Sequence, residues 1–154
     1  MNTSETFIED LANKYGRERT ALLPILQEMI ETNHFVTDDE LVAVSKELDI
    51  SAAEVYGTAS FYTFIDTVER GKFIIRICKT ITCDMKGKDE IIHAIEDTLK
   101  VKLGETTGNK KFTLLATNCL GWCHKGPAML INNEAYTELT PQKTIEIIES
   151  YMQK

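Results

Sequence analysis

Two segments contain all the cysteines of the sequence: Phe73-Ile74-Ile75-Arg76-Ile77-Cys78-Lys79-Thr80-Ile81-Thr82-Cys83 and Cys119-Leu120-Gly121-Trp122-Cys123. These four cysteines are the only ones in the 154-residue chain, and they form two close pairs, C-x4-C and C-x3-C. Each pair follows an apolar, β-branched run, residues 73–77 and residues 112–117, so each is expected where a strand ends. A helical segment lies between them. A strand, helix and parallel strand bring the carboxyl ends of both strands to one edge of a sheet, so we expect the four sulfurs to converge.

Four converging thiols have several uses. The chain begins Met-Asn-Thr-Ser-Glu-Thr and has no basic n-region, apolar h-region or long apolar run, which predicts a cytoplasmic protein that is neither secreted nor inserted in a membrane. Two structural disulfides are disfavoured in a reducing cytosol. Structural zinc prefers C-x2-C but also uses C-x4-C, and iron–sulfur clusters use C-x4-C as well. The spacing favours a cluster and leaves zinc open.

Charge is distributed unevenly along the chain. Residues 1–70 contain 5 Lys and Arg against 14 Asp and Glu, whereas residues 71–154 contain 12 against 10. An acidic first half argues against nucleic acid or an anionic membrane surface as its partner. A solvated acidic face and a docking role both remain open.

Residues 1–70 read as short helices. Residues 20–32 carry one apolar stripe, and two sequences of the capping-box type follow, Thr37 with Glu40 and Ser51 with Glu54. The second is expected to open a helix that bears Val55, Phe61, Tyr62 and Ile65. This segment has no ligand set, since His34 has no Cys or second His nearby and is expected at a helix end or in a loop. Residues 1–70 are therefore interpreted as a packing and docking module.

Residues 71–154 alternate strands and helices. After the turn Glu69-Arg70-Gly71-Lys72, strand 73–77 leads to a crossover helix over residues 87–100 and then to strand 112–117. Residues 128–131 and 134–137 flank Asn132-Asn133 and predict a β-hairpin, and a helix over residues 141–152 closes the chain. The order is βαβ followed by ββα, a mixed α+β or α/β class.

Further motifs occur in order around the cysteines: Ala21-Leu22-Leu23-Pro24, Tyr56-Gly57-Thr58-Ala59-Ser60-Phe61-Tyr62, Gly104-Glu105-Thr106-Thr107, Gly126-Pro127-Ala128-Met129 and Leu139-Thr140-Pro141. With the cysteine pairs they resemble the thioredoxin-like [2Fe–2S] subunit of NADH dehydrogenases, which recurs as the small subunit of NAD-dependent hydrogenases and formate dehydrogenases. The resemblance extends from about Leu11 to Ile148. It implies an N-terminal short helical bundle, residues 1–70, and a thioredoxin-like [2Fe–2S] ferredoxin domain, residues 71–154.

The resemblance also implies the site and the partner. One [2Fe–2S] cluster would be held by Cys78, Cys83, Cys119 and Cys123, with no catalytic residue in this chain. The chain would transfer single electrons beside the FMN of a larger NAD(P)H-oxidising or NAD(P)-reducing flavoprotein that has iron–sulfur clusters of its own, within a hydrogenase, a formate dehydrogenase or a respiratory complex. NAD would bind the partner, since this sequence has no Gly-rich dinucleotide fingerprint and no P-loop. The alternatives are a zinc-stabilised adaptor without redox function and a thiol–disulfide module, although neither pair has the C-x-x-C spacing of the latter.

Two departures from the family pattern concern the ligand loops. The first loop usually resembles C-x-G-T-A-C, whereas here Thr80, Ile81 and Thr82 precede Cys83, and the two hydroxyls are possible donors to sulfur. Trp122 stands where a small residue is common. It is expected either to shield the cluster from water or to anchor a partner.

Other residues beside the cysteines have weaker signals. Four lysines flank the ligands and either favour the reduced cluster or are ordinary surface lysines: Lys79, Lys86, Lys88 and Lys125. His93 is expected on the crossover helix, and His124 could donate a hydrogen bond near Cys123. The peptide before Pro127 is expected to be cis, as thioredoxin-like folds often have at this strand.

Overall fold

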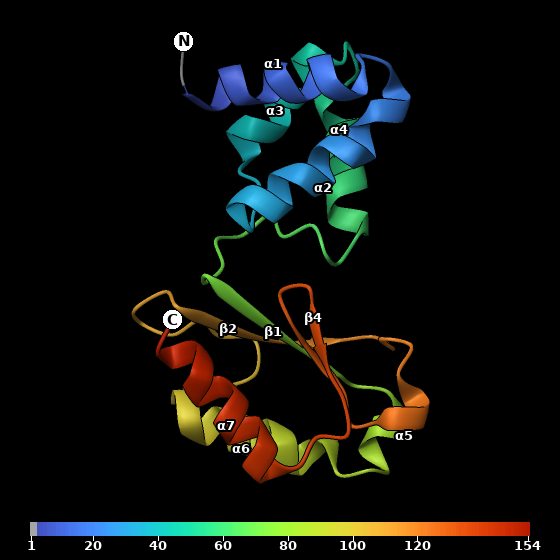
Figure 1. Ribbon diagram of the computed structural model, residues 1–154. Helices are drawn as coiled ribbons and strands as arrows, with labels where there is room; N and C mark the ends of the chain where they lie inside the picture. Colours follow the sequence, from blue (N-terminus) through green and yellow to red (C-terminus); the bar gives the residue numbers. More distant parts are fainter. Residues whose placement is uncertain (1–2) are drawn as a thin grey trace. The chain divides into compact units, whose positions relative to one another are not determined.

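The computed structural model describes residues 3–154, which divide into two compact units (Figure 1). One unit extends to Glu69, and the other comprises residues 70–154. Each unit has a hydrophobic core of its own. Within the described residues, no helix has the length and apolar character needed to cross a membrane.

The first unit is a bundle of short helices. Its elements are α1 (Thr3–Tyr15), the 3-10 turn η1 (Arg19–Ala21), α2 (Leu22–Asn33), α3 (Asp38–Glu47) and α4 (Ala52–Phe61). Their apolar stripes meet in a core whose fully buried members include Ile25, Leu26 and Met29 from α2. His34 ends α2 in the left-handed conformation, which confirms its expected place at a helix end.

One of the two predicted capping boxes forms completely. The Thr37 side chain accepts the Glu40 amide while the Glu40 carboxylate accepts the Thr37 amide at 2.8 Å. Ser51 likewise accepts the Glu54 amide at 3.2 Å, but the Glu54 carboxylate is paired with Arg19 instead of the N-cap backbone. The second box was therefore predicted wrongly, because a tertiary ion pair competes for its carboxylate.

Helix α4 is shorter than its apolar pattern predicts. It ends at Phe61, and Tyr62 is extended, so Tyr62 and Ile65 lie beyond the helix. Ile65 is still buried, but 77% of Phe61 is exposed. The expectation that one helix bears all four apolar residues is wrong, and the end of α4 presents aromatic rings to solvent.

The second unit is a four-stranded mixed sheet in the order β2-β1-β3-β4. Its strands are β1 (Phe73–Cys78), β2 (Phe112–Thr117), β3 (Met129–Ile131) and β4 (Glu134–Tyr136). β1 is parallel to β2 and antiparallel to β3, and β3 and β4 form the predicted hairpin, in which Asn132 has a positive φ. These assignments confirm the predicted order of strands.

Two helices complete the core of this unit. α6 (Lys88–Leu99) is the crossover between β1 and β2, and α7 (Pro141–Met152) follows the hairpin. They lie side by side along the same face of the sheet (Figure 1). Ile95 of α6 and Ile148 of α7 are buried in one core with alternate residues of β1, Ile75 and Ile77. The helices thus cover a face of the sheet. The loops that carry the cysteines follow the carboxyl ends of β1 and β2.

A short helix that the sequence did not predict lies between β1 and α6. This helix, α5 (Ile81–Asp84), holds the second cysteine of the first pair. A further 3-10 turn, η2 (Cys123–Lys125), begins at the last cysteine. Both elements belong to the loops that leave the strand ends.

Candidate metal centre

The two cysteine pairs leave the sheet at the same edge. Cys78 is the last residue of β1, and its register partner is Thr117, the last residue of β2. The amide of Lys79 donates to the carbonyl of Thr117 at 2.9 Å. Because β1 and β2 are parallel, their carboxyl ends coincide, and the loops that carry both pairs start side by side.

Within each pair the sulfurs are close. Cys119 Sγ and Cys123 Sγ are 3.2 Å apart, and the Cys78 and Cys83 side chains lie near enough to influence each other's pKa. Cys78 and Cys83 are only 2% and 1% exposed, whereas Cys119 is exposed and Cys123 is partly exposed. One pair is thus buried and the other lies at the surface.

Each loop also contacts the sulfurs of the other pair. The backbone of Leu120, from the second loop, acts to lower the pKa of Cys78, and the Thr82 side chain, from the first loop, acts to lower the pKa of Cys123. The backbone of Ala128 acts to lower the pKa of Cys83, and the Gly121 amide donates to Cys119 Sγ at 3.4 Å. The loops therefore form one site, and its sulfurs are surrounded by amide and hydroxyl donors.

The pKa values of the thiols reflect these neighbours. Burial acts to raise the pKa of Cys78, but the side chain and backbone of Thr80, with smaller contributions from Cys83 and Leu120, together outweigh it, and the net pKa is lowered. Burial raises the pKa of Cys83, and its contact with Cys78 raises it further. The hydrogen bond with Cys119 is the main cause that raises the pKa of Cys123. In the first pair, the Cys78 thiol is thus favoured to ionise before the Cys83 thiol.

The arrangement of the thiols can be compared with what different metals need. Among the residues that the structure describes, no group of three or more His, Cys, Asp or Glu side chains is arranged to hold a metal ion. A zinc site of four cysteines needs all four sulfurs at about 2.3 Å from one point. In a [2Fe–2S] cluster the four thiolates are divided between two irons. The two cysteine pairs of this site match the division of a cluster's thiolates between two irons.

Thr80 contacts the first sulfur directly. Its hydroxyl lies 3.1 Å from Cys78 Sγ, although Thr80 is also the N-cap residue of α5 and makes no side-chain cap there. The contact brings one of the two threonine hydroxyls of the first loop within hydrogen-bonding distance of a sulfur, where it can act as the expected donor.

Lys86 and Gly126 make contacts at the site that were not predicted from the sequence. The Lys86 ammonium donates to the backbone carbonyls of Cys123 at 3.0 Å and of His124 at 3.3 Å. A Cβ at Gly126 would lie 3.2 Å from Cys83 Sγ. The motif Gly126-Pro127 was the signal for the second contact, and its peptide bond is cis, as expected. The first contact joins residues far apart in sequence, and no local pattern predicts it.

The remaining neighbours are more ordinary. The Lys88 ammonium pairs with Asp84 at 3.1 Å, and the Lys88 side chain is 14% exposed. This ion pair stabilises the turn between α5 and α6. Trp122 is 39% exposed, and its ring stacks on that of His124 with centroids 6.1 Å apart. Trp122 thus lies at the surface of the second loop, a place compatible with both of its expected uses. His93 is on α6, as expected, 3.7 Å from Glu96.

This chain matches the model of a protein family and also individual proteins of related sequence. The family model of the thioredoxin-like [2Fe–2S] ferredoxin matches residues 8–152. The NADH-quinone oxidoreductase subunit designated E from Buchnera aphidicola subsp. Acyrthosiphon pisum is 37% identical over 144 residues, which are 94% of this chain and 89% of that protein. Its counterpart from Escherichia coli strain K12 is 36% identical over 94% of this chain and 87% of its own.

A solved structure has the same fold. An NAD⁺-reducing [NiFe]-hydrogenase in its air-oxidized state matches with a TM-score of 0.76 and 22% sequence identity, over 89% of this chain and 24% of that longer chain. At this identity the likeness concerns the fold. The match of the family model over most of the chain, and the identity with the two NADH-quinone oxidoreductase subunits, show the family. The chain belongs to the thioredoxin-like [2Fe–2S] ferredoxin family, and its cofactor is a [2Fe–2S] cluster.

Proposed function

We propose that this chain is the electron-transfer subunit of a larger NAD(P)-linked oxidoreductase and that Cys78, Cys83, Cys119 and Cys123 hold its cluster. The observation that carries the proposal is the meeting of two cysteine pairs at the carboxyl ends of β1 and β2, with donors directed at their sulfurs. A [2Fe–2S] cluster takes up and releases one electron at a time at a potential that its surroundings set.

The residues of this chain would supply those surroundings. Burial of Cys78 and Cys83 excludes water from one pair. The Thr80 hydroxyl and the Gly121 amide donate to sulfur and stabilise negative charge there. The exposed Cys119 places the other pair at the surface, where an electron can pass to or from a partner.

The partner would supply the chemistry that this chain lacks. The sequence has no dinucleotide fingerprint, so NAD(P) and the flavin are assigned to a larger flavoprotein with iron–sulfur clusters. The names of the relatives, which are subunits of NADH-quinone oxidoreductases, support a place among further subunits of such a complex. The parent complex would be a respiratory dehydrogenase, a hydrogenase or a formate dehydrogenase, and we place it in the cytoplasm.

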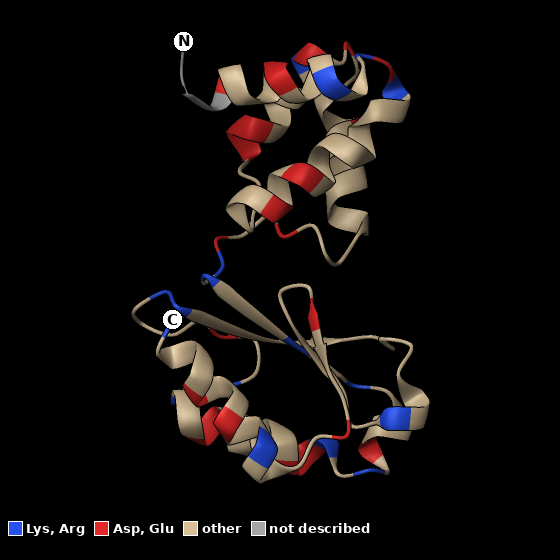
Figure 2. Ribbon diagram, viewed as in Figure 1, with Lys and Arg blue, Asp and Glu red and all other residues tan. Residues whose placement is uncertain are grey.

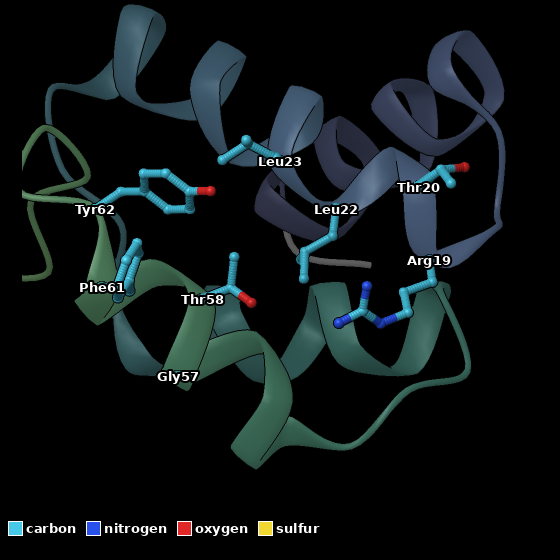
Figure 3. Close-up of a pocket in the computed structure, with 8 residues that line it drawn as sticks. All are labelled: Arg19, Thr20, Leu22, Leu23, Gly57, Thr58, Phe61 and Tyr62. Carbon is cyan, nitrogen blue, oxygen red and sulfur yellow. The ribbon is translucent and has the colours of Figure 1, made fainter.

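The helical unit is proposed to dock on that partner. Its acidic residues are spread over the helices, with few basic residues among them (Figure 2). A groove of about 420 Å³ lies between η1, α2 and α4, with Phe61 and Tyr62 at one end and Arg19 at the other (Figure 3). Exposed aromatic rings beside a groove are typical anchors of protein interfaces. Phe61, as the most exposed of these rings, is proposed to enter the partner.

Electron transfer from NADH tests the proposal. The isolated chain, purified anaerobically, should keep an oxidised cluster when NADH is added, because it cannot bind the nucleotide. The same chain in complex with its co-purified flavoprotein should develop the rhombic EPR signal of a reduced [2Fe–2S] cluster after NADH is added. If NADH reduces the isolated chain, or if dithionite but not NADH reduces it within the complex, the proposed role is wrong.

A further inference from the structure

Lys86 links the two loops that carry the cysteines. It follows α5, three residues after Cys83, and its ammonium donates to the carbonyls of Cys123 at 3.0 Å and His124 at 3.3 Å. These partners are 37 and 38 residues further along the chain. One side chain of the first loop therefore contacts the backbone of the second loop at a cysteine.

The position of the ammonium suits those carbonyls. Cys123 and His124 are the first two residues of the single 3-10 turn η2, and the last carbonyls of a helical turn have no partner within it. A cation is the favourable partner for such carbonyls. Lys86 thus stabilises a turn that is too short to stabilise itself.

The stem of Lys86 is held as well as its tip. A Cβ built at Gly126 would lie 3.4 Å from Lys86 Cδ and 3.2 Å from Cys83 Sγ, so the stem and the sulfur both pass close to this glycine. The nearby Lys88 ammonium is engaged by Asp84 and Asp89. Lys86 is therefore the flanking lysine whose contacts bridge the two cysteine loops.

We infer that Lys86 is a positioning residue for the cluster: it fixes the segment at Cys123 against the first loop, so that the two pairs keep one separation, and it adds a positive charge beside the second pair. The inference rests on the proposed ligands and deepens that proposal. A positive charge near the site favours the more negative, reduced cluster. If Lys86 positions the loop, its hydrogen bonds should also slow the loss of the cluster. A nearby positive charge without these hydrogen bonds would not have that effect.

The test compares three variants of the full chain. Lys86→Met keeps most of the stem and removes the ammonium, Lys86→Arg restores charge and donors, and Lys79→Met removes an exposed positive charge that directly follows Cys78. The rate of cluster loss is followed by visible absorbance under anaerobic conditions with excess chelator. Lys86→Met should lose its cluster at least about tenfold faster than wild type, since hydrogen bonds from charged groups are lost. Lys86→Arg and Lys79→Met should stay within about twofold of wild type.

Two further measurements complete the test. The reduction potential should fall in both Lys→Met variants, because each loses a positive charge. In the apo chain, backbone hydrogen exchange over residues 119–126 should be faster in Lys86→Met than in Lys79→Met. If Lys86→Met loses its cluster no faster than Lys79→Met, or if exchange in the apo chain is unchanged, Lys86 does not position the loop.

Poor folding has a separate readout. If Lys86→Met takes up no cluster but its apo form keeps the wild-type secondary structure, the loss of cluster supports the inference, whereas an apo form that is unfolded as a whole overturns it, because Lys86 would then hold the fold and not the loop. A wild-type chain without iron and sulfide would overturn the proposed ligands instead. In that case faster exchange over residues 119–126 in apo Lys86→Met would still support the bridge.

Discussion

The hydroxyl of Thr80 contacts a cysteine sulfur. It lies 3.1 Å from Cys78 Sγ, and it makes no side-chain cap on α5. Hydrogen bonds to the sulfurs of an iron–sulfur cluster stabilise its reduced state and raise its potential. The family pattern commonly has a glycine in this loop, so the hydroxyl is a feature of this chain.

Replacing Thr80 by Val should therefore lower the reduction potential. One hydrogen bond contributes about 0.5–1.5 kcal/mol, which corresponds to roughly 20–60 mV for a one-electron couple. A redox titration followed by EPR measures the shift. Thr80→Ser keeps the hydroxyl and should stay near wild type; a Thr80→Val potential equal to that of Thr80→Ser would show that the hydroxyl does not act on the cluster.

Gly126 gives a prediction that depends on space. An added Cβ would lie 3.2 Å from Cys83 Sγ, closer than ordinary van der Waals contact. Overpacking of this kind typically costs about 1–3 kcal/mol, and here it would displace a proposed ligand. Gly126→Ala should hold less iron per chain after anaerobic purification.

Gly108 is the matched control for Gly126, because an added Cβ there meets nothing within 4 Å and its φ is not positive. Gly108→Ala should retain the wild-type iron content. Equal iron in the two variants would mean that the Cys83 sulfur has room to move.

At the scale of elements, the strands were predictable and the loops were less so. β2 begins and ends where the apolar run predicts, and β1 extends one residue further, to Cys78. Helix α5 was not predicted, because Ile81 and Thr82 favour strands and four residues are too few for a helical period. The end of α4 at Phe61 was also missed, and so was the pairing of Glu54 with Arg19, which is a contact between elements that no local pattern encodes.

The same reasoning applies to the site. The spacing of the cysteines and the order of the strands predicted that both pairs lie at one edge of the sheet. The threonines of the first loop predicted a hydroxyl beside a sulfur. The contact of Lys86 with the second loop joins residues 37 positions apart, and the sequence indicated only that this lysine flanks a ligand. Local patterns thus predict which groups gather, whereas tertiary packing decides which of them touch.

The complete capping box of α3 gives a prediction for an element. Thr37→Ala removes the side chain that accepts the Glu40 amide, and loss of an N-cap typically costs about 1 kcal/mol. Hydrogen exchange of the α3 amides should accelerate by roughly fivefold, while Thr37→Ser should preserve protection. The visible spectrum of the cluster should not change, since Thr37 and the cysteines belong to different units. Unaltered exchange in Thr37→Ala would mean that the cap does not limit the opening of α3.

In the whole molecule, the two units have separate cores and different proposed roles. The first has the acidic charge and most of the exposed aromatic rings, and the second has all four cysteines and the exposed Trp122. The proposed function assigns docking to the first and electron transfer to the second. Separate cores imply that the second unit keeps its fold without the first.

A fragment of residues 70–154 should therefore keep the spectrum of the full chain and lose the partner. Its visible and EPR spectra are compared with those of the full chain, and its association with the flavoprotein is measured by co-purification. Retained binding by the fragment would place the docking surface on the second unit. Phe61→Ala in the full chain is the finer test, and it should weaken association while the spectrum stays unchanged.

Chemical analysis of the freshly purified anaerobic chain decides whether the four thiols hold a [2Fe–2S] cluster. Iron and acid-labile sulfide should be present in equal amounts, two of each per chain, as the cluster requires, and Ser replacement of any one cysteine should lower both. The wild-type chain should be coloured and show a rhombic EPR signal only after reduction. A colourless chain that contains one zinc ion and no sulfide would contradict the account.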